Sequence, residues 1–180
     1  QSAGGTNGYG GNITVTLNGS ARAYGVDADG VFAQSGGGFT VVTPPIPTAP
    51  SALPRGISAN GDVLVTIASN SVVQGGTGSG VGVRFADGVN NTLVNYGTVT
   101  SVGGLTGTAV SGTQANERID NFGEIVGSVN LGGGGNALNN KANGILFTGG
   151  SLDLGAGNTL ANSGMISRGD ADNIQVTALN

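Results

Sequence analysis

The sequence predicts an all-β fold, namely one right-handed parallel β-helix (a β-solenoid) of roughly eight turns with a Pro-rich insertion at one corner. Three observations lead to this prediction. A short motif containing Asn-x-Gly returns along the chain, aliphatic and β-branched residues recur in short runs such as 13–17, and glycine contributes 37 of the 180 residues while charged residues make up 9%. A disordered chain of similar glycine content would not keep supplying β-branched clusters.

The strongest signal is the repeat Asn-x-(Leu/Ile)-x-Asn-x-Gly-x-(Ile/Val). Its copies begin at residues 91, 117, 136 and 158, so the spacings are 26, 19 and 22 residues. The second copy has Glu117 in the first Asn position, and the third copy reaches its glycine late, at Gly144. A spacing near 20 residues that tolerates drift is typical of a solenoid, because extra residues bulge out at a corner without breaking the stack.

Alternation within the motif assigns a role to each position. In a strand, alternate residues face one side, so we expect the aliphatic residues of the motif to fill the core. The Asn should lie at the following bend and bond to backbone groups and to the Asn of the next turn, and the Gly should permit that bend. A β-sandwich also uses many short strands, but it does not predict one Asn-x-Gly per turn. The residues that carry the repeat are Leu93, Asn95, Gly97, Ile119, Asn121, Gly123, Leu138, Asn140, Leu160, Asn162 and Gly164.

Two longer repeats extend the pattern over the rest of the chain. Residues 128–132 match 151–155 at a shift of 23, and residues 11–17 align with 61–67 at a shift of 50. The shift of 50 also places Gly30-Val31 on Gly80-Val81.

All five prolines lie between residues 44 and 54. This segment lacks ladder donors and favours polyproline II, which is typical of a domain linker. The same repeat runs on either side of it, however, which favours an insertion in a continuous solenoid. We therefore expect one domain over 1–180, with 43–55 as a protruding Pro-rich loop.

Composition narrows the classes of function. The chain has no His, no Cys and one Lys, which excludes Ser-His-Asp, Cys-His and histidine-ligated zinc sites. Six Lys+Arg against ten Asp+Glu argue against nucleic acid as a partner, and no apolar run approaches the roughly 20 residues of a membrane helix. The repeat register places Asp120 beside Val94, Asn139 and Ala161, so no column of acids results. We expect no cofactor, no membrane insertion by this segment and no catalysis.

Two pairs of carboxylates are weak candidates for a calcium site. Asp27 and Asp29 form one pair, and Asp170 and Asp172 form the other. Calcium takes six to eight oxygen ligands, and neither pair lies in a calcium-binding nonapeptide repeat. Solvated acids in turns are the alternative interpretation.

Two further features are candidates for interaction. Arg168-Gly169-Asp170 is an integrin-type tripeptide, although in a glycine-rich chain such a tripeptide also arises by chance. Tyr96 and Phe122 occupy the same position of consecutive repeats and should point outward as a stacked pair. Such a pair either binds a glycan or a partner chain, or covers a corner of the solenoid.

These motifs resemble the passenger regions of autotransporters, the type V secreted proteins of double-membraned bacteria. The resemblance lies in the copies of Leu-x-Asn-x-Gly-x-Ile, the Leu-Gly pairs at 131–132 and 154–155, the run 30–38, and the ending 163–169. In that ending, Arg168 stands where the family usually has Pro. The resemblance implies export, display at the bacterial cell surface and a β-helical stem, but no particular ligand.

We therefore expect a non-enzymatic extracellular surface-display or adhesion module, whose partner is a second copy, a host surface or a glycan. One alternative is a self-associating subunit of an extracellular filament or biofilm matrix. Another is a polysaccharide-active β-helix enzyme. We expect the chain to be a fragment, a cleaved passenger or a subunit built outside the cell.

Overall fold

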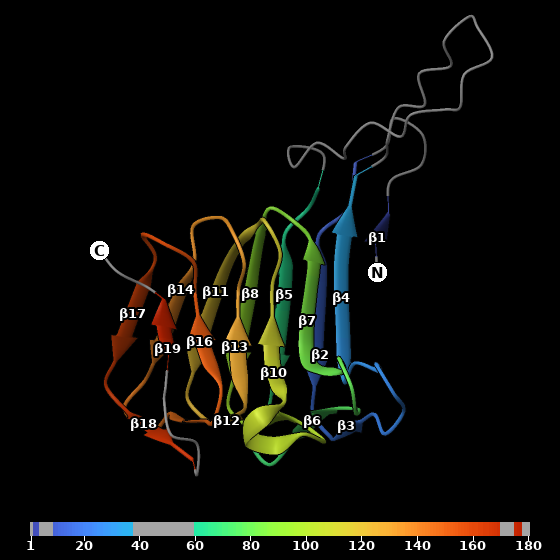
Figure 1. Ribbon diagram of the computed structural model, residues 1–180. Helices are drawn as coiled ribbons and strands as arrows, with labels where there is room; N and C mark the ends of the chain where they lie inside the picture. Colours follow the sequence, from blue (N-terminus) through green and yellow to red (C-terminus); the bar gives the residue numbers. More distant parts are fainter. Residues whose placement is uncertain (1, 4–8, 38–59, 170–174, 178–180) are drawn as a thin grey trace, which may run out of the picture.

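A computed structural model describes residues 2–3, 9–37, 60–169 and 175–177, and these residues form a stack of short parallel strands (Figure 1). The strands make three parallel sheets, and every described pairing between strands is parallel. The expected fold class, an all-β parallel β-helix, is thereby confirmed.

Each sheet takes one strand from each turn. Sheet A contains β1 (Ser2–Ala3), β4 (Val31–Gly36), β7 (Val81–Asp87), β10 (Thr108–Ser111), β13 (Ser128–Asn130), β16 (Ser151–Asp153) and β19 (Gln175–Thr177). Sheet B contains β2 (Ile13–Leu17), β5 (Val63–Ile67), β8 (Asn90–Asn95), β11 (Asn116–Asn121), β14 (Ala137–Asn140) and β17 (Thr159–Asn162). Sheet C contains β3 (Ala21–Arg22), β6 (Val72–Gly75), β9 (Thr98–Ser101), β12 (Glu124–Val126), β15 (Ile145–Thr148) and β18 (Met165–Arg168).

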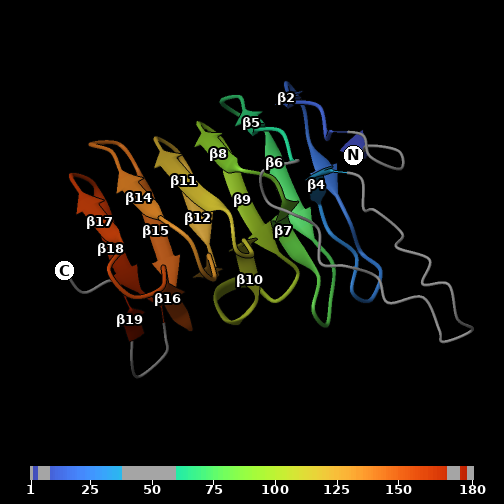
Figure 2. The same cartoon turned by 90° about the horizontal axis from the view of Figure 1, so that it is seen from above.

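The chain visits sheets B, C and A in that order, and then repeats the circuit. In Figure 1 the strands of sheet A run upward in front and β17 of sheet B runs downward behind, while the chain advances from right to left, so the coil is right-handed. Figure 2 shows the same succession of turns from above. The six-stranded sheets B and C give six complete turns in the described residues, fewer than the eight expected. Connections such as η2 (Gly104–Thr106) take residues that a uniform spacing assigns to strands.

One column of side chains from sheet B runs the length of the core. In this column Ile119 lies in register with Leu93 on one side and with Leu138 on the other, and all three are essentially inaccessible to solvent. Branched aliphatic side chains stack here because equivalent positions of successive turns face inward. The column comprises Val15, Val65, Leu93, Ile119, Leu138 and Leu160.

A ladder of asparagines marks the bend that follows sheet B. Asn95 donates from Nδ2 to Oδ1 of Asn121, Asn121 donates to Asn140, and Asn140 donates to Asn162, each over 2.8 Å. The same amides donate to backbone carbonyls, for example Asn121 to the Ile145 oxygen at 3.1 Å. The bend thus obtains buried donors that satisfy its free carbonyl groups, which is the role that the repeat predicts.

The glycine of the repeat is required by close approach between turns. A Cβ atom on Gly97 would collide with the carbonyl oxygen of Ser71, and one on Gly123 would collide with that of Gly97. Neither glycine has a positive φ. Close packing of backbone on backbone therefore fixes glycine here.

The long repeats are confirmed in part. Residues 13–17 pair with 63–67 at the expected shift of 50, and Val129 pairs with Leu152 at the expected shift of 23. The placement of Val31 on Val81 is wrong, because Val31 pairs with Val83. The connection between β5 and β6 carries two more residues than that between β2 and β3, because sheet B pairs at a shift of 50 whereas Ala21 of sheet C already pairs with Val73. Sheet A keeps this register. The Pro-rich loop 43–55 lies outside the described residues.

Candidate functional site

The outward corner between sheets B and C carries the two aromatic residues of the repeat. Each follows an asparagine of the ladder, so the rigid column beneath fixes both side chains. The rings of Tyr96 and Phe122 stack with centroids 4.8 Å apart and an angle of 14° between their planes. Tyr96 is 47% exposed and Phe122 is 37% exposed. The outward orientation and the stacking agree with the sequence prediction.

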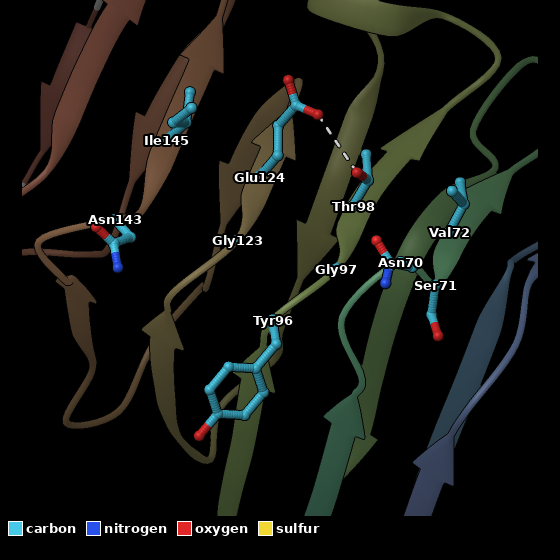
Figure 3. A pocket seen from close by; sticks show the side chains of 10 residues that line it. All are labelled: Asn70, Ser71, Val72, Tyr96, Gly97, Thr98, Gly123, Glu124, Asn143 and Ile145. Atoms are coloured by element: carbon cyan, nitrogen blue, oxygen red, sulfur yellow. Dashed lines mark hydrogen bonds between the residues drawn. The ribbon is translucent and has the colours of Figure 1, made fainter.

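A groove of about 400 Å³ lies beside this stack. Figure 3 shows Tyr96 on one side of the backbone at Gly97 and Gly123, with Thr98 and Glu124 on the other side. The two glycines contribute no side chain, so the backbone itself is the floor of the groove. We call this hollow the corner groove.

The two ends of the corner groove are marked by asparagines. Asn70 comes from the turn before β6, and Asn143 from the turn before β15, and Figure 3 shows them on opposite sides of the glycine floor. Both are exposed, and neither side-chain amide makes a hydrogen bond within the described residues. Across the groove, Thr98 Oγ1 donates to Glu124 Oε2 at 3.3 Å. The groove therefore presents an aromatic ring, free amides, a hydroxyl and a carboxylate.

Sheet B carries a second, smaller hollow of about 280 Å³ near β2, β5 and β8. Its polar side chains already bond to each other. Asn12 Oδ1 accepts from the Asp62 backbone N–H at 2.9 Å, and Asp62 Oδ1 accepts from Asn90 Nδ2 at 3.0 Å. These contacts form an outer polar ladder that stitches successive turns together, and they leave fewer free groups than the corner groove offers.

The first pair of calcium candidates is engaged in structural contacts. Asp27 Oδ1 accepts hydrogen bonds of 2.8 Å from both the N–H and the Oγ of Ser79, and these bonds lower the pKa of Asp27. Asp29 forms a bidentate pair with the Arg84 guanidinium at 2.7 and 3.1 Å. Asp170 and Asp172 lie outside the described residues. Within the described part of the chain, no three carboxylate, His or Cys side chains gather where they could hold a metal ion.

The described part of the integrin-type tripeptide belongs to the sheet. Arg168 closes β18 and lies in register with Thr148, and the N–H of Gly169 donates to the Thr148 carbonyl at 3.2 Å. Asp170 lies outside the described residues. Arg168 and Gly169 therefore continue the ladder of sheet C rather than standing on a projecting loop.

The residues that pair with Asp120 in the stack are not acids. Asp120 stands in register with Val94 and Asn139, and it accepts hydrogen bonds from Arg118 at 2.8 Å and from Asn139 at 2.9 Å. Partial burial acts to raise the pKa of Asp120, but these bonds and that from Lys141 outweigh it, and the pKa is lowered. A carboxylate held ionised in this way suits a surface ion-pair network.

Sequence reasoning missed the burial of Glu117. This residue replaces Asn in a second inward ladder with Asn91, Asn136 and Asn158, and it is 1% exposed. Its Oε1 accepts from Asn91 Nδ2 at 3.1 Å and from the Thr113 N–H at 3.3 Å, while its Oε2 is buried without a partner. Burial raises the pKa of the Glu117 carboxyl. The sequence could have predicted this burial. Residues 91, 93 and 95 alternate along one strand and so face the same side, and Glu117 occupies the position of residue 91 in the next copy of the repeat.

No helix among the described residues combines the length and apolarity that crossing a membrane requires. Comparison of the chain with protein-family models, with curated proteins and with solved structures finds no match.

Proposed function

We propose that this chain is a non-enzymatic module of an extracellular surface, a β-helical stem that displays adhesive side chains, as in the passenger regions that its repeats resemble. The resemblance supports export and surface display. The partner is then a host surface or a glycan, met by the outer face of the stack.

The observation that carries this proposal is the exposed Tyr96–Phe122 stack on a rigid column. Two large aromatic rings at 47% and 37% exposure are poorly placed in water. The asparagine ladder beneath them prevents their withdrawal into the core, because its positions are filled and hydrogen-bonded. Rigid, exposed aromatic residues are typical anchors of binding surfaces.

Adhesion is tested with beads that carry the purified chain. The beads are washed over cultured epithelial cells, either untreated or stripped of surface glycans by glycosidases, and retained beads are counted. We expect retention above that of beads carrying serum albumin, with no release of sugar from soluble polysaccharides. Absence of retention together with cleavage of a polysaccharide would contradict the proposal and favour the enzyme.

Self-association is a second candidate, favoured by the solvent exposure of β17, the last described strand of sheet B. In β17, Thr159, Ala161 and Asn162 are exposed, and the Asn162 Nδ2 donates no hydrogen bond within the described residues. A further turn from another copy would accept that donor and extend the ladder. Sedimentation velocity at increasing concentration tests this: growing species support it, and a single species of monomer mass contradicts it.

A further inference from the structure

We infer that the corner groove binds a neutral glycan, with one sugar ring packed on the exposed part of the Tyr96 ring. This inference rests on the proposed adhesive function and names its ligand class and site. Four observations carry it: the exposure of the Tyr96 ring, the polar side chains without protein partners, the charge of the groove and its direction along the stack.

The Tyr96 ring is stacked on Phe122, and 47% of the residue is exposed to solvent. Phe122 covers the side toward the next turn, at a centroid distance of 4.8 Å. Within the described residues no other aromatic ring stacks on Tyr96, and Lys141 Nζ lies over the Phe122 ring, 6.0 Å from its centroid. Phe122 thus supports the tyrosine ring, and the exposed part of that ring can receive the C–H-rich face of a sugar.

The polar groups of the groove match hydroxyl groups in kind. Asn70 and Asn143 each offer an amide that both donates and accepts, and neither amide has a protein partner within the described residues. Glu124 accepts a hydrogen bond from Thr98 at Oε2, and its Oε1 has no hydrogen-bond partner within the described residues. A polyhydroxylated ligand supplies both donors and acceptors, so it can satisfy all three side chains at once.

Charge selects among glycans. Among the described residues, Glu124 is the only ionisable side chain besides Tyr96 that lines the groove. A uronate or another acidic sugar placed there would bring two negative charges together, which is unfavourable at short range. Neutral hexoses and N-acetylhexosamines avoid this repulsion.

The groove runs along the stack and crosses four successive turns. Its lining residues come from the turns that contain β6, β9, β12 and β15. Turns repeat at about 4.8 Å, so the span is about 14 Å. This length suits a short linear oligosaccharide rather than a single sugar.

Binding is tested with short oligomers of glucose, galactose and N-acetylglucosamine, and with a galacturonate oligomer as the acidic counterpart. The chain has three Tyr and no Trp, so tyrosine fluorescence sums three residues, and comparison with Tyr96→Ala isolates the contribution of Tyr96, while calorimetry gives affinities. We expect at least one neutral oligomer to bind, and Tyr96→Ala to weaken it about tenfold or more. Asn143→Ala should weaken it severalfold, and Glu124→Gln should raise the affinity for galacturonate. Tyr24→Ala, a change at a tyrosine 70% exposed outside the groove, is the matched control and should change nothing.

The outcomes separate this inference from the proposed function. Failure of every neutral oligomer to bind at millimolar concentration, or binding indifferent to both Tyr96→Ala and Asn143→Ala, would overturn the inference. If beads still adhere to cells in that case, the adhesive function stands and acts elsewhere. If oligomers bind in the groove but beads do not adhere, the site stands and the adhesive function fails.

Discussion

At the scale of single residues, Glu117 is the position at which a buried carboxyl replaces an asparagine amide in the second inward ladder. An asparagine offers a donor and an acceptor in one turn of the stack, whereas an ionised carboxylate offers acceptors only. Oε2 of Glu117 and Oδ1 of Asn91 are both buried without a partner, so this point of the ladder has too few donors. Glutamine would supply the missing amide with almost the same shape.

Glu117→Gln should therefore stabilise the protein at neutral pH by about 1–3 kcal/mol. The pKa of folded Glu117 is raised above its unfolded value. The protonated form thus favours folding, and this contribution is present in full below the unfolded pKa and is lost as pH rises through the folded pKa. The advantage of the variant should shrink toward pH 4, which melting curves across pH 4–8 will show. Glu124→Gln at the surface is the control, and an advantage that does not vary with pH would contradict this account.

The asparagine ladder makes a second prediction at this scale. Asn121→Ala removes the donor to Asn140 Oδ1 and to the Ile145 carbonyl, as well as the acceptor for Asn95. Leaving buried polar groups unpaired should lower the free energy of unfolding by about 3 kcal/mol. Asn143→Ala, at an exposed asparagine without a side-chain hydrogen bond, should change it by less than about 0.5 kcal/mol. Urea denaturation of both variants makes the comparison, and equal losses would mean that the ladder adds little.

At the scale of elements, the described ends of the Pro-rich insertion meet. The N–H of Gly37 donates to Asn60 Oδ1 at 2.6 Å, so the chain departs from and returns to one point of the stack. The entropy of closing a loop changes little with its length. Deletion of residues 44–54 should therefore shift the melting temperature by only a few degrees, as measured by circular dichroism. A large loss would mean that the segment packs against the stack.

The strands were predictable from the sequence wherever their residues recur at fixed positions. Leu93 and Ile119 identify one inward column, and Tyr96 and Phe122 identify the outward position beside it. The connections were less predictable, because nothing in residues 68–71, between β5 and β6, shows that they move the register of the following strands by two positions. Bulges at corners do not disturb the strands, so they leave no periodic trace.

The corner groove could not be foreseen for a related reason. Its walls come from four turns that are far apart in sequence, and its openness depends on how closely backbones approach at Gly97 and Gly123. The sequence contains one hint. In two consecutive repeats an aromatic residue is followed directly by a glycine, so a projecting side chain lies next to a position without one. The unpaired state of Asn70 and Asn143 depends on three-dimensional distances alone.

At the scale of the whole molecule, each turn touches mainly its neighbours, so stability should be distributed along the stack. Ile119 lies in an inner turn with Leu93 and Leu138 on its two sides and has no exposed surface. Leu160 belongs to the last turn of sheet B and is only partly buried. The same chemical change should therefore have different effects at these two positions.

Ile119→Ala should lower the free energy of unfolding by about 2–5 kcal/mol, and Ile119→Asp should unfold the inner turns, because it buries an unpaired charge. Leu160→Ala should lower it by less than about 2 kcal/mol, since water already reaches that side chain. Hydrogen exchange read by mass spectrometry should show faster exchange in β8, β11 and β14 for Ile119→Ala, but only in β14, β17 and β18 for Leu160→Ala. Uniform acceleration over all described strands in both variants would mean that the stack unfolds as one unit, and the turn-by-turn description would then be wrong.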